Sequence, residues 1–482
     1  MSLRQKALSG IKWTSLSSLV NTVLQLFQLS ILTHYLSPSD FGLMAIVYVI
    51  IGFSALFMDM GISASIIHRQ DLDRIELSSL YWLNLFAGLL LFVLVFLAAP
   101  WIAAFYKEPA LTELVRLLAI TFVTNSLGNQ FKLLLQKELH FDLLARVSIL
   151  TVATSLLLAT LLAINGWGVY SLVYAALGSS LLNAAVFLAV GFRRHRPALI
   201  FRFSAIRPML SFGMFQMADR SITYFNAQFD VILIGKLLGV EALGVYSVAK
   251  NLSMRPARVI NPIITRVTFP VLAKIQDEPE RLRRIYLKTI DYLSTVNFFI
   301  YLLMAMLAEP LITVLFGQKW ERSVEILQIL ALYGAIRSTG NPQGTLLLSK
   351  GRADLGFYLN VGKFFVMTLV ITAASHWGLT GVAVSLLFLT TVFIFPNWYF
   401  VVHPLSGAGG WEYLSRILRP LGINALGAVT AWAVCRMIGV TDPYLGGVVV
   451  IIVMTAVFIG LNLRYNREFL LTVGDLLGRR KR

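Results

Sequence analysis

Residues Tyr224–Arg258 read YFNAQFDVILIGKLLGVEALGVYSVAKNLSMRPAR and predict a helical hairpin. Two apolar runs are separated by a short turn that contains two glycines, as a hairpin of helices requires. The second run, which begins at Leu243, also carries three cations: Lys250, Arg255 and Arg258. Because apolar helices rarely contain cations, we expect function to depend on this stretch.

An earlier stretch, Gln28–Ile50, has a related pattern and reads QLSILTHYLSPSDFGLMAIVYVI. A shift of 202 residues aligns Leu36 with Leu238 and Gly42 with Gly244. Two similar hairpins at equivalent positions predict that the chain is a doubled unit. Only the second copy contains the three cations, so the two halves are not functionally equivalent.

The composition is that of an integral membrane protein. Of 482 residues, 57% are hydrophobic and only 13% are charged, whereas soluble domains are about one quarter charged. The formal net charge of +17 does not indicate nucleic-acid binding, because the basic residues lie in loops between apolar segments. The single cysteine, Cys435, excludes an internal disulfide.

The apolar segments predict an all-α protein with about 14 transmembrane helices, each of about 20 residues. The repeat predicts two six-helix lobes, related by a pseudo-two-fold axis along the membrane normal, and two additional helices. The predicted lobes are residues 1–196 and 197–405, and residues 406–482 hold the two added helices and a basic tail. Basic loops alternate along the chain, which predicts that both termini are cytoplasmic.

No catalytic or nucleotide-binding motif is present. The six histidines are scattered, with no pair at the i, i+4 spacing of a helical metal site. There is no phosphate-binding glycine loop. The sequence therefore predicts a transporter without a metal or cofactor, and not an enzyme.

Charged residues inside apolar segments are the candidate site residues. A charge at the centre of a spanning helix costs about 2.5–3.5 kcal/mol, so it marks a water-filled cavity or a structural ion pair. On one continuous helix, Lys250, Arg255 and Arg258 share one broad face, which favours a cavity wall for anionic cargo. The predicted substrate-binding residues are Arg220, Lys250, Arg255, Arg258 and Arg337. Asp59 and Asp219 are the predicted cation-coupling residues, although Asp219 beside Arg220 also fits a structural pair.

Several motifs resemble the Wzx-type polysaccharide flippases of the multidrug/oligosaccharidyl-lipid/polysaccharide exporter superfamily, most nearly its colanic acid exporter branch. The resemblance covers nearly the whole chain. Its motifs include SPSDFGLMA, DMGISASIIHRQDL, NPIITRVTFPVLAKIQD, LFGQKW, LQILALYGAIRSTGNPQG and LLLSKGRADLGF.

The resemblance implies a location in the bacterial inner membrane, and transfer of an undecaprenyl-pyrophosphate-linked oligosaccharide from the cytoplasmic to the periplasmic leaflet. It also implies alternating access, with a proton or sodium ion as the coupling ion. The expected partners are the lipid-linked oligosaccharide, membrane lipids, a polysaccharide polymerase and a chain-length regulator. Two alternatives remain: a drug/cation antiporter of the same superfamily, for which an acidic cavity is expected, and a polymerase or ligase, which needs a larger outer loop.

Overall fold

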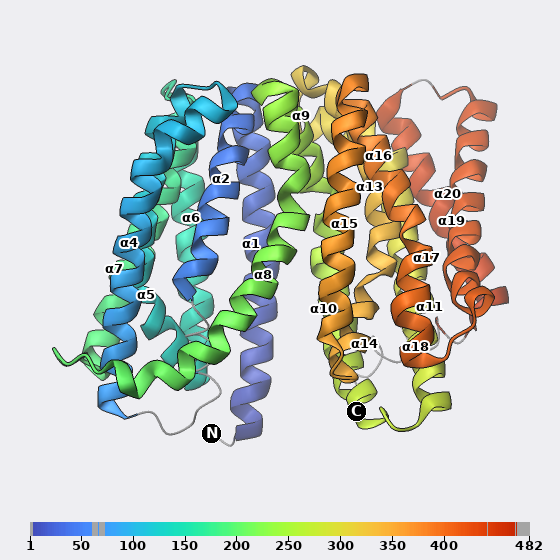
Figure 1. The fold of residues 1–482 in the computed structure, drawn as a ribbon. Coiled ribbons are helices and arrows are strands. Elements are labelled where there is room, and N and C mark those ends of the chain that lie inside the picture. The colour runs from blue at the N-terminus through green and yellow to red at the C-terminus, as the bar shows by residue number, and fades with distance from the viewer. Residues whose placement is uncertain (1–2, 60–65, 67–72, 441, 468, 470–482) are drawn as a thin grey trace. The chain divides into compact units, whose positions relative to one another are not determined.

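The computed structural model describes all residues except 1–2, 60–65, 67–72, 441, 468 and 470–482. The described residues form helices and turns, with no strand among them, so the prediction of an all-α fold is confirmed (Figure 1). The chain separates into two compact units, Met1–Gly244 and Val245–Arg482. Each unit is treated by itself below.

The N-terminal unit consists of long helices that cross it with few interruptions. They are α1 (Leu3–Tyr35), α2 (Pro38–Asp59), α4 (Arg74–Tyr106), α5 (Ala110–Lys137), α6 (Phe141–Ile164), α7 (Tyr170–Arg194), α8 (Phe203–Leu237) and the start of α9 (Gly239–Ser253). Helix α5 packs between α4 and α7, α6 packs on α1 and α7, and α8 packs on α2 and α4.

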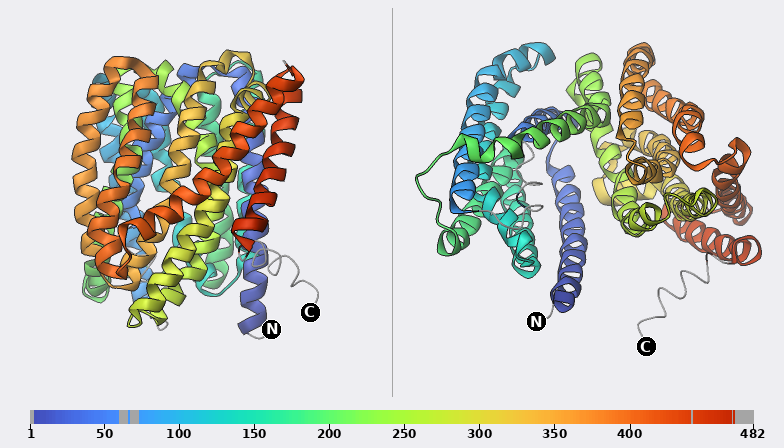
Figure 2. Two further views of the ribbon diagram at one scale, coloured as in Figure 1. Left: turned by 90° about the vertical axis from the view of Figure 1, so that its right-hand side faces the viewer. Right: turned by 60° about the horizontal axis from the view of Figure 1, so that its bottom comes forward.

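The C-terminal unit is organised around α11 and has shorter, broken helices. They are the rest of α9, α10 (Arg255–Lys274), α11 (Pro279–Met306), α12 (Ala308–Phe316), η1 (Gln318–Trp320), α13 (Arg322–Thr339), α14 (Asn341–Ser349), α15 (Ala353–Ala374), η2 (Ser375–Trp377), α16 (Gly378–Val392), α17 (Ile394–Asn397), the π-turn η3 (Trp398–Val402), α18 (His403–Ser406), α19 (Gly410–Ile438) and α20 (Pro443–Tyr465). Helix α11 packs against α10, α13 and α19, and α20 packs against α19 (Figure 2).

Local sequence explains where several helices begin. At α4, the Asp73 side chain accepts from the Glu76 N–H at 2.6 Å, and Glu76 accepts from the Asp73 N–H at 3.0 Å. This capping box satisfies two backbone donors that a helix start leaves unpaired. At α20, Asp442 caps the helix and Pro443 occupies the first turn, where its missing N–H is not needed.

The expectation of one continuous helix from Leu243 past Arg258 is not met. The structure divides it into α9 and α10, with Met254 between them. Pro256 lies in the first turn of α10, where proline has no N–H to donate and its ring crowds the preceding turn. Met254 itself keeps helical backbone angles (φ −83°, ψ −9°), and its N–H donates to the Lys250 carbonyl at 3.0 Å, so α10 follows α9 after an interruption of one residue.

Ten stretches among the described residues are long and apolar enough to cross a membrane. One of them, Asp354–Ser406, contains two of the predicted helices. The predicted segments outside these ten stretches are Met209–Ile234, Leu243–Val271 and Val324–Leu348. The last two are broken in the structure, and Leu243–Val271 carries the cations, so neither presents a long apolar window.

The compact units and the predicted lobes are defined by different criteria. The units follow packing, and α8 packs with α2 and α4. The lobes at residues 1–196 and 197–405 follow the sequence repeat, and residues 406–482 lie outside it. These bounds stay a prediction.

Two aligned glycines make reciprocal close contacts within the N-terminal unit. A Cβ added at Gly42 would lie 1.8 Å from the Val240 carbonyl oxygen, and one added at Gly244 would lie 1.8 Å from the Pro38 carbonyl oxygen. Pro38 and Val240 are themselves related by the shift of 202 residues. Gly42 thus contacts Val240, and its equivalent Gly244 contacts Pro38, the equivalent of Val240. This exchange of equivalent partners is typical of a two-fold contact.

Replacing Gly42 with Ala should destabilise the fold, because the new Cβ must push two backbones apart. Overpacking of this kind costs about 1–3 kcal/mol. The measurement is the thermal unfolding midpoint of purified protein. Gly460→Ala is the matched control, since no atom lies within 4 Å of the Cβ that it would add. Equal unfolding midpoints for both variants would contradict the close-contact interpretation.

Candidate functional site: a cation cluster beside α11

Helix α10 is held against α11 by polar contacts at buried positions. The Asn297 side chain on α11 donates to the Asn261 side-chain oxygen on α10 at 3.1 Å. Both asparagines are buried, so each needs a partner inside the protein. One turn beyond Asn297, the fully buried Tyr301 lies against Ala257 of α10. These contacts fix the first two turns of α10, which carry the arginines.

The three cations of the opening stretch lie on either side of the helix break. Lys250 is half-buried near the end of α9, and its Nζ lies 5.9 Å from the ring centroid of the buried Tyr246. Arg255 is half-buried at the first position of α10, and Arg258 is exposed one turn later. Arg255 and Arg258 lie within electrostatic range of each other, so an anion bound near one guanidinium group is also attracted by the other.

Helix α13 adds a fourth cation to this region. Gly334 allows the close approach, because a Cβ there would lie 2.5 Å from the Tyr301 ring. Arg337 follows in the last turn of α13 and donates to the Tyr333 hydroxyl at 2.8 Å. Tyr301 lies within electrostatic range of both Arg337 and Arg258.

Lys363 on α15 is a further member. It is half-buried and lies within electrostatic range of Arg337, with its Nζ 5.4 Å from the Phe393 ring centroid. We refer to Arg255, Arg258, Arg337 and Lys363 as the cation cluster. Spacing alone could not find it, because α10, α13 and α15 are far apart in sequence.

The remaining predicted site residues belong to the N-terminal unit. Arg220 is exposed on α8. Asp59 ends α2 and Asp219 lies in α8, but their side chains lie outside the described residues. Among the described acidic residues, Asp230 and Asp291 are 4% and 5% exposed. Asp291 accepts a hydrogen bond from Asn466 at 3.3 Å.

The cation cluster suits an anion better than a catalytic step. Arginine presents several donors to a phosphate or carboxylate, and lysine adds a compact positive charge. The described residues contain no group of three His, Cys, Asp or Glu side chains arranged to hold a metal ion. The arrangement can therefore bind and orient a phosphate or an acidic sugar.

This architecture defines a multi-pass helical membrane protein. Over 95% of this chain and all of the other, it resembles the solved lipid II flippase MurJ in an inward closed conformation, with a TM-score of 0.75 at 12% identity. It also resembles an inward-facing multidrug resistance MATE family transporter, with a TM-score of 0.65 at 17% identity over 83% of this chain and 98% of that one. These likenesses confirm the fold.

The chain belongs to the polysaccharide biosynthesis protein family, whose sequence model matches residues 31–325. It is 35% identical to the teichuronic acid biosynthesis protein TuaB of Bacillus subtilis (strain 168), over 90% of each chain. It is 32% identical to the lipopolysaccharide biosynthesis protein WzxC of Escherichia coli (strain K12), over 90% of this chain and 88% of that one. The Wzx-type resemblance is thereby confirmed.

If the cation cluster faces water, a cysteine placed there should react with a reagent that cannot enter lipid. We expect Arg258→Cys and Arg337→Cys, each in a Cys435→Ser background, to react with a charged maleimide from the aqueous phase. Leu369→Cys on α15, where the native side chain is 72% exposed, should react on the order of tenfold more slowly because lipid excludes the thiolate. Equal rates at all three positions would contradict a water-filled site.

Proposed function

We propose that this protein translocates an undecaprenyl-pyrophosphate-linked oligosaccharide repeat unit from the cytoplasmic to the periplasmic leaflet. The product would serve exopolysaccharide biosynthesis of the colanic acid type. The observation that carries the proposal is the cation cluster, in a chain of the polysaccharide biosynthesis family. A pyrophosphate carries negative charges that arginine and lysine can bind inside an otherwise apolar protein.

Each predicted binding residue has a role in this proposal. Arg255 and Arg258 bind one phosphate of the pyrophosphate. Arg337 and Lys363 bind its other phosphate or an acidic sugar. Lys250 lies beyond the break at Met254, so a change in the angle between α9 and α10 would alter its distance from the cargo. Arg220 binds the cargo from the N-terminal unit.

Alternating access would move the cargo between leaflets. Broken helices provide bending points, and the C-terminal unit contains several of them. An ion gradient supplies the work, with a proton or sodium ion bound at Asp59 or Asp219. Both termini are cytoplasmic in this proposal, and a polymerase and a chain-length regulator act on the exported unit.

The rival activity is that of a drug/cation antiporter, which the MATE-like fold permits. A cationic drug would be repelled by four neighbouring basic side chains. The cation cluster therefore favours an anionic cargo.

Removing charge from the cation cluster should reduce export without unfolding the protein. We expect Arg255→Gln combined with Arg258→Gln to lower export at least about tenfold, because each charge-assisted hydrogen bond contributes about 1.5–3 kcal/mol. The measurement is complementation of a flippase-null strain, with membrane abundance determined in parallel.

The matched control is Arg436→Gln on α19, where the guanidinium lies 4.6 Å from the Trp432 ring centroid, away from the cation cluster. It should export normally. Arg255→Lys should be nearly as damaging as the loss of charge if bidentate phosphate binding matters. Normal export by the double variant at normal abundance would overturn the assignment of these arginines.

The ion-coupling assignment is tested by Asp59→Asn and Asp219→Asn. Each should abolish the response of transport to a proton or sodium gradient, because Asn keeps the size of the side chain but cannot bind a proton. Flux in vesicles with imposed gradients is the measurement. Asp230→Asn serves as the comparison, and loss of coupling in that variant alone would transfer the role to Asp230.

A further inference from the structure

A second basic region lies within the C-terminal unit, at the ends of three helices. A cavity of about 1090 Å³ opens where α11 and α19 begin and where the chain leaves α20. Seven of its fifteen lining residues are basic and four are acidic. We call this cavity the basic pocket. It is separate from the cation cluster, because the two share no residue.

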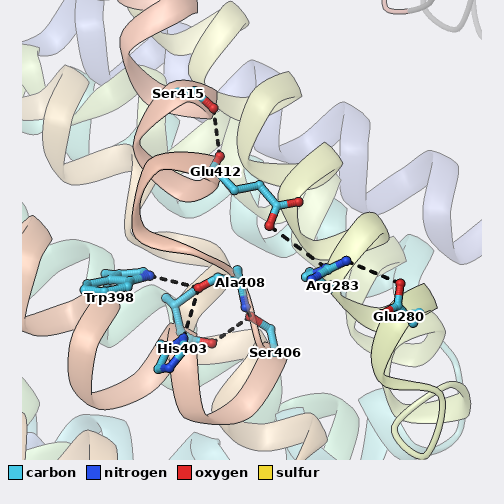
Figure 3. Close-up of polar contacts among 9 residues, drawn as sticks. Glu280, Arg283, Trp398, His403, Ser406, Ala408, Glu412 and Ser415 are labelled. Atoms are coloured by element: carbon cyan, nitrogen blue, oxygen red, sulfur yellow. Dashed lines mark hydrogen bonds and ion pairs between the residues drawn. The ribbon is translucent and has the colours of Figure 1, made fainter.

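The first two walls of the basic pocket are held together by local contacts (Figure 3). Gly407 has a φ of +69°, which turns the chain before α19. The Trp398 indole then donates to the Ala408 carbonyl at 3.0 Å and fixes that turn. Arg283 of α11 lies 3.3 Å from Glu280 and 4.0 Å from Glu412 of α19. The starts of α11 and α19 are thereby joined.

The third wall is the segment that follows α20. Asn466 donates to the buried Asp291 of α11 at 3.3 Å. Phe469, which is also buried, packs edge-on against Tyr292 with ring centroids 5.3 Å apart. Arg467 lies between these two anchoring contacts and lines the basic pocket. The pocket is therefore built by specific packing, and is not only a set of exposed loop residues.

The acidic residues of the basic pocket are already engaged. Glu278 pairs with Arg281 at 3.2 Å. Glu280 and Glu412 both pair with Arg283, and Asp291 accepts from Asn466. With seven basic and four acidic residues, the pocket has a formal excess of three positive charges.

Four lining arginines have no ion pair with a carboxylate among the described residues: Arg284, Arg416, Arg419 and Arg467. They come from all three walls, so their guanidinium groups surround one space. Concentrated positive charge is costly unless a counter-ion is bound. The natural counter-ion is one that accepts several hydrogen bonds at once, as a phosphate does.

The position of α19 indicates that the phosphate belongs to a lipid. Trp411, in its first turn, is 75% exposed, and exposed tryptophans lie at the level of lipid headgroups. Arg416 and Arg419 follow five and eight residues later, roughly 7.5–12 Å further along the helix. Leu418 and Leu463 are exposed beside them on α19 and α20, where they can contact acyl chains.

We propose that the basic pocket binds the phosphate headgroup of an anionic membrane lipid. Arg284 and Arg419 contact the phosphate from two walls, and Arg467 closes the third. The acyl chains lie along the exposed apolar surface of α19 and α20. The bound lipid would fix the two added helices against α11, and this role is independent of the cargo.

Native mass spectrometry of the full-length protein, titrated with phosphatidylglycerol or phosphatidylcholine of the same chain length, tests the proposal. We expect the wild type to retain phosphatidylglycerol in preference. Arg284→Gln combined with Arg419→Gln should lower the affinity for phosphatidylglycerol about tenfold, because two charge-assisted contacts are lost. Both side chains are exposed, so the fold should survive. Arg467→Gln, from the third wall, gives a second and milder variant.

The matched control is Arg322→Gln combined with Arg436→Gln, which removes the same charge outside the basic pocket. It should retain phosphatidylglycerol as the wild type does. An excess of inorganic phosphate tests whether the basic pocket binds free phosphate or the phosphate of a lipid headgroup. It should leave the lipid bound. Equal retention of both lipids, equal loss in the control variant, or displacement by free phosphate would each overturn the proposal.

Discussion

A hydrocarbon layer offers no hydrogen bonds to the backbone, and this constraint governs where the helices can break. The described helices of the C-terminal unit break at Met254, Leu307 and Gly340. An interrupted helix leaves carbonyl groups that need protein or water nearby. Breaks and cations occur together here: Arg255 follows Met254, and Arg337 precedes Gly340. Protein or water near these positions can bond to the unpaired backbone carbonyls and can also solvate the positive charges.

Helix α11 connects the two basic regions of the C-terminal unit. Asp291, near the middle of α11, lies in the basic pocket, and Tyr301, ten residues later, lies beside the cation cluster. Ten residues of helix span roughly 15 Å, so one rigid rod carries both. Its buried face includes Ser294, Asn297 and Phe298, which allows little independent movement of the two ends.

The sequence predicted the helical class and the membrane location, because apolar length and loop charge depend only on composition along the chain. The family was predicted from the resemblance of its motifs. It also identified Arg255, Arg258 and Arg337 individually. Pro256 inside this apolar run indicated a disturbed helix, but a proline can either bend a helix or begin one, and the structure has it in the first turn of α10. Lys363 joins the three arginines only in the structure, where it lies within electrostatic range of Arg337 of α13. The basic pocket was missed for the same reason: its walls come from residues far apart in the sequence.

The reciprocal contacts of Gly42 and Gly244 have a consequence for how this protein can vary. Gly42 contacts Val240 and Gly244 contacts Pro38, and these two partners are themselves equivalent residues of the repeat. The helix crossing is therefore self-complementary, as a homodimer interface is. In a homodimer with this crossing, one substitution would alter both contacts at once. In a single chain, each contact can change alone. Lys250, Arg255 and Arg258 have no basic counterparts 202 residues earlier, so the shared crossing does not require the two copies to carry the same charges.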